Sequence, residues 1–346
     1  METSDPTASS RRARTAGARS AHLEREAKLD APPGFALPEL GGDGATVGTS
    51  RARRLESTYW DTAGLRLLRW GCTLRHRRGE GWTVKLPATS LGVLLARTEH
   101  TFAAPPTSPP AEALDLVLAY TRREPVVPVA RMVTRRRAVR VTGPDGGDLA
   151  ELDDDEVTAY VDDRESVRFR ELEVELAEGA PPDTLDRLVR RLRAHGADAS
   201  DPTPKLVRVL GDEARLPPDV VVDRLGRTAT AGDGVRAAIA ASVRRLLTHD
   251  PGVRLGGDPE DVHQARVAVR RLRSDLRTFS PLLAAEWTAE LRDELRWLGG
   301  ELGAVRDAEV LRDRLQAKAG RLPPADAEAG RRVVCALDGD VRESRR

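Results

Sequence analysis

Residues 171–176 read Glu-Leu-Glu-Val-Glu-Leu, so acidic and apolar side chains alternate without interruption. Successive side chains of a β-strand point to opposite faces, so the three glutamates would share one face and the three apolar residues the other. The same alternation recurs in three further segments, residues 22–29, 73–77 and 82–86. The pattern predicts an antiparallel sheet with one apolar face and one charged face.

The charged faces of these strands complement one another. Three glutamates in a row on one strand face repel each other unless cations or basic neighbours compensate them. The other strands supply four such bases, Lys28, Arg75, Arg77 and Lys85. A closed barrel with its charged faces turned inward would satisfy every group, and its apolar faces would pack outward against helices such as residues 183–194. The alternative is an ordinary sheet whose charged face lies in water.

Charge is segregated along the 346 residues, although 56 Lys and Arg against 55 Asp and Glu give a net charge of only +1. Residues 51–85 carry nine basic and three acidic side chains, whereas residues 151–175 carry eleven acidic and three basic ones. This balance argues against a simple basic nucleic-acid coat or an acidic tail protein. The near-neutral total is therefore a sum of two opposite local fields.

Several classes of protein are disfavoured by what the sequence lacks. Two distant cysteines, Cys72 and Cys335, give neither a disulfide framework nor a cysteine-based zinc site. Residues 1–20 contain no apolar signal segment and are expected to form a disordered tail, and no run of about 18 apolar residues would span a membrane. We expect a cytoplasmic protein without membrane partners.

The segment Glu24-x-Glu26-x-Lys28 resembles the ExExK signature of the CYTH family, the triphosphate tunnel metalloenzymes. Matching segments follow in the family's order at residues 59–62, 74–77, 82–87, 97–99, 135–137, 152–155, 171–175 and 205–208. The resemblance covers residues 21–211 and implies an antiparallel eight-stranded β-barrel that forms a tunnel. In that tunnel acidic residues would hold Mg²⁺ or Mn²⁺, and basic residues would hold a triphosphate.

The resemblance also implies roles for individual residues. Carboxylate oxygens suit hard divalent cations, and Arg and Lys neutralise phosphate oxygens. The expected metal ligands are Glu24, Glu26, Asp153, Glu171, Glu173 and Glu175, and the expected catalytic residues are Glu24, Glu26 and Lys28. The expected triphosphate-binding residues are Lys28, Arg75, Arg77, Lys85, Arg97, Arg135, Arg136, Lys205 and Arg208.

The sequence leaves open which arginine of residues 135–137 faces the tunnel, but it does predict the direction of His76. In the basic strand, the family pattern favours Arg136, whereas Arg135 and Arg137 would share the opposite face. His76 lies between Arg75 and Arg77, so strand alternation directs it away from the tunnel.

Helical patterns begin near Thr230, after a Pro- and Gly-containing linker at residues 212–229. Asp258 is a good N-cap for a helix that starts at Pro259. At 100° per residue, His263 and four arginines fall on one side of this helix: Arg266, Arg270, Arg273 and Arg277. An apolar stripe lies almost opposite, formed by Ala265, Val269, Leu272, Leu276 and Phe279. The arginines have no acid between them in their arc, which favours a polyanion as partner.

Residues 262–273 are similar to the signature helix of CHAD domains, and residues 294–311 resemble that family's next segment. The resemblance implies an α-helical bundle that binds inorganic polyphosphate through His263, Arg266, Arg270, Arg271, Arg273 and Arg306. Residues 230–346 have about half the length that the resemblance implies for a CHAD domain, so we expect only its first half. The whole chain is then an α+β protein.

The leading hypothesis is a metal-dependent hydrolase of inorganic triphosphate joined to a polyphosphate-binding module, with association to polyphosphate granules as one expected location. A rival hypothesis is a non-catalytic polyphosphate-binding protein. The same tunnel would also suit thiamine triphosphate, or ATP as in class IV adenylyl cyclases, but few aromatic residues are available to stack on an organic group. A nucleic-acid partner is disfavoured, although phosphate chains attract arginine in the same way.

Overall fold

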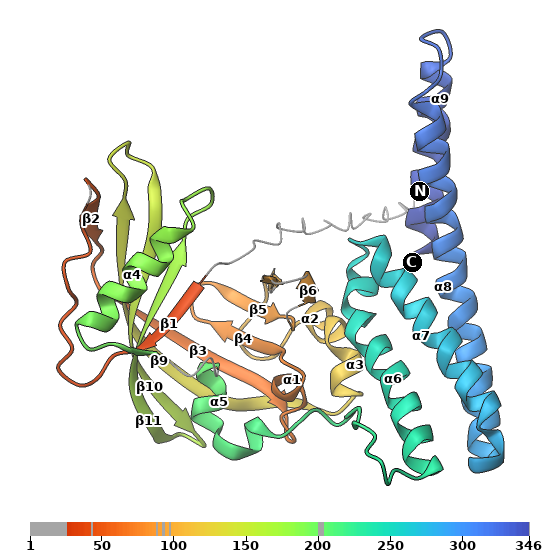
Figure 1. Ribbon diagram of the computed structural model, residues 1–346, viewed down its shortest axis with the longest axis horizontal. Coiled ribbons are helices and arrows are strands. Elements are labelled where there is room, and N and C mark those ends of the chain that lie inside the picture. Colours follow the sequence, from red (N-terminus) through yellow and green to blue (C-terminus); the bar gives the residue numbers. More distant parts are fainter. Residues whose placement is uncertain are drawn as a thin grey trace, which may run out of the picture.

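The computed structural model describes residues 26–42, 44–87, 89–91, 94–96, 98–199 and 204–345. In this part of the chain a region rich in strands is followed by a series of long helices (Figure 1). The expected disordered tail at residues 1–20 and the predicted site residues Glu24 and Arg97 lie outside the described residues.

One antiparallel sheet of ten strands dominates the first region. In their order of pairing, the strands are β12 (Asp198–Ala199), β1 (Glu26–Asp30), β11 (Arg164–Leu176), β10 (Asp148–Val161), β9 (Val126–Thr142), β3 (Arg53–Thr62), β4 (Thr73–Arg77), β5 (Gly81–Lys85) and β8 (Glu99–Phe102), with β2 (Thr46–Thr49) beside β9. A separate hairpin joins β6 (Thr89–Leu91) and β7 (Leu94–Ala96).

The expected closed barrel of eight strands is not what the pairing of the described residues shows. The ladder runs as an open path from β12 to β8, and no pairing between described residues joins these two edges. Both edge strands are short: β12 pairs with β1 over two residues, and β8 pairs with β5 over four. The sheet is strongly curved all the same (Figure 1), so the antiparallel prediction is confirmed and the closure of the ladder is corrected.

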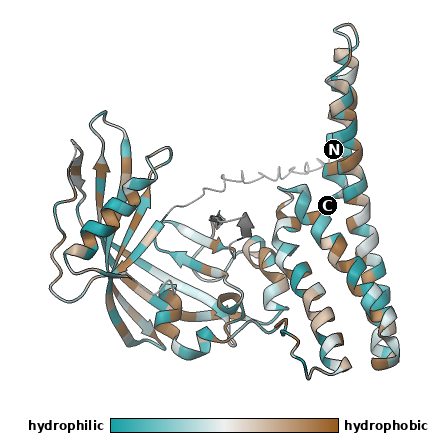
Figure 2. Ribbon diagram, in the orientation of Figure 1, coloured by the Kyte–Doolittle hydropathy of each residue, from teal (hydrophilic) through white to brown (hydrophobic). Residues whose placement is uncertain are grey.

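The two faces of the sheet differ as the alternation predicted. We call the side that carries Lys28, Arg136, Asp155 and Glu173 the charged face, and the opposite side the apolar face. Figure 2 shows hydrophilic and hydrophobic residues alternating along the strands. On the apolar face, helix α4 (Asp183–Ala194) covers a buried cluster that includes Leu152, Leu172 and Val174. The helix predicted at residues 183–194 is confirmed.

Short helices cover the remaining parts of the sheet. Helices α1 (Arg66–Arg69), α2 (Ala111–Leu116) and α3 (Leu118–Thr121) contribute to the core that buries Trp82 and Tyr120. Helix α5 (Lys205–Leu210) and the 3₁₀ turn Gly211–Arg215 pack against Met132 and Val157, at one end of the charged face. One end of this face is therefore apolar and filled.

Four long helices follow: α6 (Ala231–Leu255), α7 (Pro259–Thr278), α8 (Ala285–Ala319) and α9 (Ala327–Ser344), with a 3₁₀ turn at Ser280–Leu282. The side chain of Asp258 accepts a hydrogen bond from the backbone N–H of Glu260, which confirms the predicted N-cap of α7. The predicted apolar stripe is confirmed too, because Ala265, Val269, Leu272 and Leu276 are buried against α8.

The helical region meets the sheet region through α6. Leu247 of α6 packs against the core beneath α2 and α3. No helix among the described residues is long and apolar enough to cross a membrane. Helices α8 and α9 extend well beyond α6 and α7 (Figure 1).

Candidate functional site

Strand register brings acidic and basic side chains together on the charged face. Strand β10 places Asp153 opposite Glu173 and Asp155 opposite Glu171 of β11. On the two flanking strands, Lys28 of β1 lies opposite Glu173, and Arg136 of β9 lies opposite Asp155. Directly opposed residues share a face, so the alternation seen in the sequence becomes one continuous charged surface.

Arg136 lies among three carboxylates. It forms two hydrogen bonds to Asp155, with donor–acceptor distances of 2.7 and 2.6 Å, and it also pairs with Asp153. Its Nη2 atom lies 3.4 Å from Oε2 of Glu173. Arg135 points to the opposite face, where it pairs with Glu156 at 3.2 Å. The structure thus places Arg136, and not Arg135, on the charged face.

Helix α5 contributes two further cations to the same carboxylates. Lys205 and Arg208 are three residues apart, so they lie on one side of the helix. Lys205 Nζ lies 2.7 Å from Asp155 Oδ2 and 3.3 Å from Glu171 Oε1. Arg208 Nη1 lies 2.6 Å from Asp30 Oδ1 and 3.4 Å from Glu171 Oε2. Both side chains thus neutralise, from one end, carboxylates of β1, β10 and β11, which we call the acidic strands.

Lys28 completes the cluster from β1. Its Nζ atom lies 2.9 Å from Glu173 Oε1 and 3.5 Å from Glu26 Oε1. Glu26 in turn lies opposite Glu175 across the β1–β11 pairing. The described residues of the ExExK segment therefore lie on the acidic strands.

Burial and nearby charges shift the pKa values of these carboxyl groups in opposite directions. Burial raises the pKa of Glu171 to about 7 and that of Asp153 to about 6, against the opposing effects of Lys205 and Arg136 respectively. Burial would also raise the pKa of Glu173, but the nearby charges of Lys205 and Lys28 hold it well below its usual range. Neighbouring carboxyl groups can thus differ in protonation near neutral pH.

A basic group lies on β4 and β5, farther along the charged face. Arg77 donates hydrogen bonds to Ser57 and Glu80, both at 3.1 Å, and Lys85 pairs with Glu99. Burial lowers the pKa of Arg77, and the charge of Arg75 lowers it further. Arg75 has no hydrogen bond or ion pair within the described part of the chain, and its Nε atom is buried. Its guanidinium group is available to an anion.

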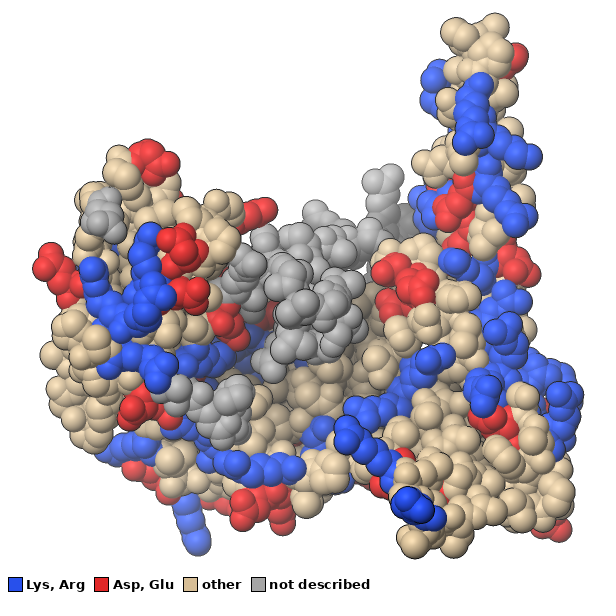
Figure 3. All heavy atoms as spheres, in the orientation of Figure 1, with Lys and Arg blue, Asp and Glu red and all other residues tan. Residues whose placement is uncertain are grey.

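The helical region carries the second predicted site. Arg270 and Arg277 of α7 are exposed, and neither they nor Arg273 forms a hydrogen bond or ion pair with another described residue. Arg266 differs, because Asp307 of α8 lies 3.4 Å from it. The arc of α7 itself carries no acid, as its sequence shows, but an acid from the neighbouring helix α8 lies beside Arg266. Figure 3 shows many Lys and Arg side chains along α8 and α9.

Two other predicted polyphosphate-binding arginines are also engaged within the protein. Arg271 pairs with the buried carboxylate of Asp275 at 3.1 Å. Arg306 pairs with the buried Glu309 at 3.2 Å and donates a hydrogen bond to the carbonyl oxygen of Pro259. Their charges are therefore less available to a polyanion than those of Arg270 and Arg273.

Comparison with known families agrees with this geometry. The CYTH domain matches residues 22–200, more than half of the chain, and the CHAD domain matches residues 237–346. The chain belongs to the CYTH family. Its CYTH domain is followed by a CHAD region, in the order that the sequence predicted.

Relatives of this CYTH–CHAD chain include uncharacterized proteins from two strains of Mycobacterium tuberculosis. Each is 37% identical over 325 residues, which is 88% of this chain and 61% of the relative. The chain thus spans about three fifths of the length of the curated relatives that it matches.

Solved structures similar to the CYTH domain include a proposed adenylate cyclase from Bacillus halodurans. It is 16% identical, covers 55% of this chain and 98% of its own, and has a TM-score of 0.35. Another is a proposed adenylyl cyclase from Hippeastrum described as having a dominant triphosphatase activity. It is 16% identical, covers 54% of this chain and 94% of its own, and has a TM-score of 0.30.

CYTH enzymes generally use divalent metals, and the acidic strands of this domain are compatible with one. Asp153 Oδ1 is buried and has no hydrogen-bond partner among the described residues, and Glu171 Oε1 is buried and forms an ion pair with Lys205. Within those residues no group of three or more Asp, Glu, His or Cys side chains is arranged as a complete ligand set. Mg²⁺ commonly takes one or two carboxylates and completes its shell with water and phosphate. Carboxylates of the acidic strands are thus donors of the kind that such an ion takes from protein.

Three acidic residues of this CYTH domain were missed by sequence reasoning. Asp155 binds Arg136 and Lys205, Asp30 binds Arg208, and Glu99 binds Lys85. The alternation could have identified the first two, because Asp155 is two residues from Asp153 and Asp30 is two residues from Lys28. His76 packs against Trp82 with a centroid distance of 5.1 Å and rings tilted by 60°, away from the charged face, as the alternation predicted.

Proposed function

We propose that the CYTH domain hydrolyses inorganic triphosphate with a divalent metal, in a tunnel that the curved sheet forms around the substrate. The observation that carries this proposal is the division of one sheet face into two parts. Arg75, which forms no hydrogen bond or ion pair with a described residue, marks the basic part. Asp153, whose Oδ1 atom has no hydrogen-bond partner among the described residues, and Glu171, which pairs with Lys205, mark the acidic part. A triphosphate with its metal needs both kinds of group at once.

In this proposal the basic part binds the phosphate chain. Arg75, Arg77 and Lys85 would bind its non-bridging oxygens, with Arg136 between them and the acidic strands. Arg97 would join them, and Arg135 would not, because it lies on the opposite face. Arginine binds such oxygens bidentately, which fixes the orientation of the chain.

The acidic part would hold the metal. Asp153 and Glu173 are the best-placed ligands, with Glu24, Glu26 and Glu175 as further candidates, whereas Glu171 would accept the proton instead. Bound Mg²⁺ or Mn²⁺ would neutralise phosphate charge and thereby favour phosphoryl transfer. Lys28, Lys205 and Arg208 neutralise the carboxylates in the free protein, and they would bind phosphate oxygens once the substrate is present.

Glu171 is the best candidate for the general base. Burial raises its pKa to about 7, so it can accept a proton near neutral pH. The oxygen of water would bond to the terminal phosphorus, the bridging P–O bond would break, and the proton of the water would pass to Glu171. Phosphate and pyrophosphate would be the products.

The CHAD region would bind inorganic polyphosphate. Arg270, Arg273 and His263 form the core of this proposed site, and Arg266, Arg271 and Arg306 would contribute less because each has an acidic partner. This binding would hold the enzyme near polyphosphate.

A substrate panel tests the proposal. Purified protein should release phosphate from inorganic triphosphate with Mg²⁺ or Mn²⁺, and it should do so faster than from thiamine triphosphate, ATP or long-chain polyphosphate. Glu26→Gln and Glu171→Gln should lower this activity by at least about 100-fold. Glu156→Gln, on the opposite face, is the matched control and should retain it. Binding of triphosphate without turnover by the unmodified chain would instead support a non-catalytic polyphosphate-binding protein.

A further inference from the structure

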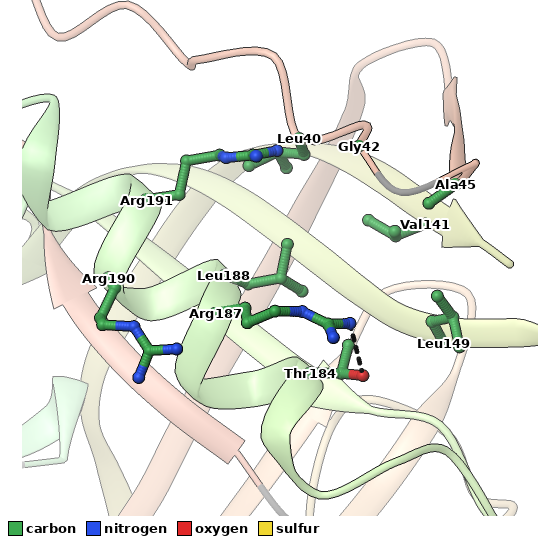
Figure 4. Close-up of a pocket in the computed structure, with 10 residues that line it drawn as sticks. All are labelled: Leu40, Gly42, Ala45, Val141, Leu149, Thr184, Arg187, Leu188, Arg190 and Arg191. Atoms are coloured by element: carbon green, nitrogen blue, oxygen red, sulfur yellow. Dashed lines mark hydrogen bonds between the residues drawn. The ribbon is translucent and has the colours of Figure 1, made fainter.

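A cavity of about 200 Å³ lies on the apolar face of the sheet, between α4 and the segment that follows β1 (Figure 4). Its floor is apolar and consists of Leu40, Val141, Leu149 and Leu188. Leu40, Val141 and Leu188 are buried members of the core between α4 and the sheet. The cavity is therefore separated from the proposed triphosphate site by the sheet itself.

The rim of this cavity is basic. Arg187, Arg190 and Arg191 of α4 line it, and none of its described lining residues is acidic. Arg190 forms no hydrogen bond or ion pair with another described residue, whereas Arg187 is hydrogen-bonded to Thr184 and Asp183. An exposed arginine on a helix is usually solvated, and the charge of Arg187 is largely compensated by Asp183. The local positive field that favours an anion at this hollow therefore comes from Arg190 and Arg191.

Arg191 is held in place by the backbone. It donates hydrogen bonds to the carbonyl oxygens of Glu39 and Gly41, which come from the segment on the other side of the cavity. A Cβ atom at Gly42 would lie 3.2 Å from Nη2 of Arg191, so the glycine leaves room for this close approach. The guanidinium group is thus positioned before any ligand arrives, which lowers the entropy cost of binding.

We propose that this cavity binds a small phosphate monoester whose ester group is apolar. The apolar group would lie on the leucine and valine floor, and the phosphate would lie at the rim among the arginines. The volume corresponds to roughly seven water molecules at about 30 Å³ each, so the ligand has on the order of ten non-hydrogen atoms. A dianionic phosphate suits two guanidinium groups that have no acidic partner among the described residues, those of Arg190 and Arg191, better than a single carboxylate does. This site lies outside the proposed hydrolase site and does not depend on it.

Phenyl phosphate and inorganic phosphate are suitable probes, and calorimetry of the full chain in EDTA measures both. Saturating triphosphate should be present, so that the charged face and the arginines of α7 are already occupied. Phenyl phosphate should bind at least about tenfold more tightly than inorganic phosphate, because only the ester places apolar surface on the floor. Equal affinities of phenyl phosphate and inorganic phosphate would overturn the role of the apolar floor. Displacement of phenyl phosphate by triphosphate would overturn the claim that the cavity is a separate site.

Two variants and one control test the location. Arg190→Ala should weaken phenyl phosphate binding by about tenfold, whereas Arg193→Ala, a basic residue of the same helix that does not line the cavity, should change it by less than about twofold. Ala45→Leu keeps every charge but places three more carbon atoms in the cavity, so it should weaken phenyl phosphate binding by at least about tenfold without lowering the thermal midpoint. Unchanged binding in Ala45→Leu, or equal losses in the two arginine variants, would overturn the proposal.

Discussion

Arg136 of β9 binds both carboxylate oxygens of Asp155 on β10, in a two-hydrogen-bond pair in which the carboxylate is buried and the arginine side chain is 19% exposed. The distances are 2.7 and 2.6 Å, and Asp155 is 0% exposed. Lys205 binds the same carboxylate from α5 at 2.7 Å. The pair thus joins two central strands to the helix that fills one end of the charged face, and it has a structural role as well as a place in the proposed site.

Arg136→Met should destabilise the fold by about 3 kcal/mol, because removing one partner leaves a buried charge incompletely compensated. Arg135→Met is the matched control, since Arg135 is the neighbouring residue but pairs with Glu156 in solvent, with side chains 59% and 53% exposed. Arg135→Met should lower the free energy of unfolding by less than about 1 kcal/mol. Urea denaturation of both variants measures the difference. Similar losses would show that the buried pair does not stabilise the sheet.

Glu171 should make folding stability depend on pH. Burial raises its pKa from an ordinary value of 4.5 to about 7, so the folded protein holds this proton more tightly than the unfolded chain does. Stability from this group is complete below pH 4.5 and is lost as the pH rises towards 7. Glu171→Gln should reduce that fall, by up to about 1.4 kcal/mol per pH unit. Urea denaturation at about pH 5, 6 and 7 in EDTA, which spans this titration, tests this.

Glu99→Gln is the control for this pH dependence. Burial would raise the pKa of Glu99, but Lys85 brings it below its ordinary value, so its titration is complete before about pH 5. Glu99→Gln should therefore show the full decline in folding stability over the same pH range. A decline that is the same in Glu171→Gln as in the unmodified protein would contradict the assignment to Glu171.

Local patterns in the sequence predicted the parts of the fold whose causes are local. The alternation at residues 73–77 coincides with β4, and Asp258 followed by Pro259 marks the start of α7. The pairing of strand edges is different, because it depends on contacts between segments far apart in the chain. The sequence therefore predicted an antiparallel sheet but not the open ladder of the described strands.

The same distinction explains the site. Strand alternation placed Glu171 and Glu173 on one face, and the register of β10 and β11 keeps them there. The partner of Arg266 could not be predicted in this way, because Asp307 comes from a different helix and its approach depends on how α7 packs on α8. Periodicity assigns residues to faces, whereas partners across elements require the tertiary structure.

Arg75→Ala should separate activity from stability. Its buried Nε atom has no partner among the described residues, and its charge lowers the pKa of Arg77, so removing it should change the free energy of unfolding by less than about 0.5 kcal/mol. A lost charged hydrogen bond to phosphate should lower kcat/KM for triphosphate by about 10- to 100-fold. Arg78→Ala, 83% exposed, should leave both quantities unchanged. Full activity in Arg75→Ala would contradict a phosphate-binding role.

Salt dependence should identify the arginines of α7 that contact polyphosphate. Each phosphate contact releases condensed counterions, so a lost contact reduces the slope of log affinity against log salt concentration by about 0.7 for a single chain. Arg270→Ala and Arg273→Ala should each show this reduction, because neither side chain has a partner among the described residues. Arg271 lies about 100° around the helix from Arg270, the nearest member of the arginine arc, and it pairs with Asp275, so Arg271→Ala should reduce the slope less. Equal reductions in the three variants would mean that polyphosphate senses only the net charge of α7, and that no arginine face is selected.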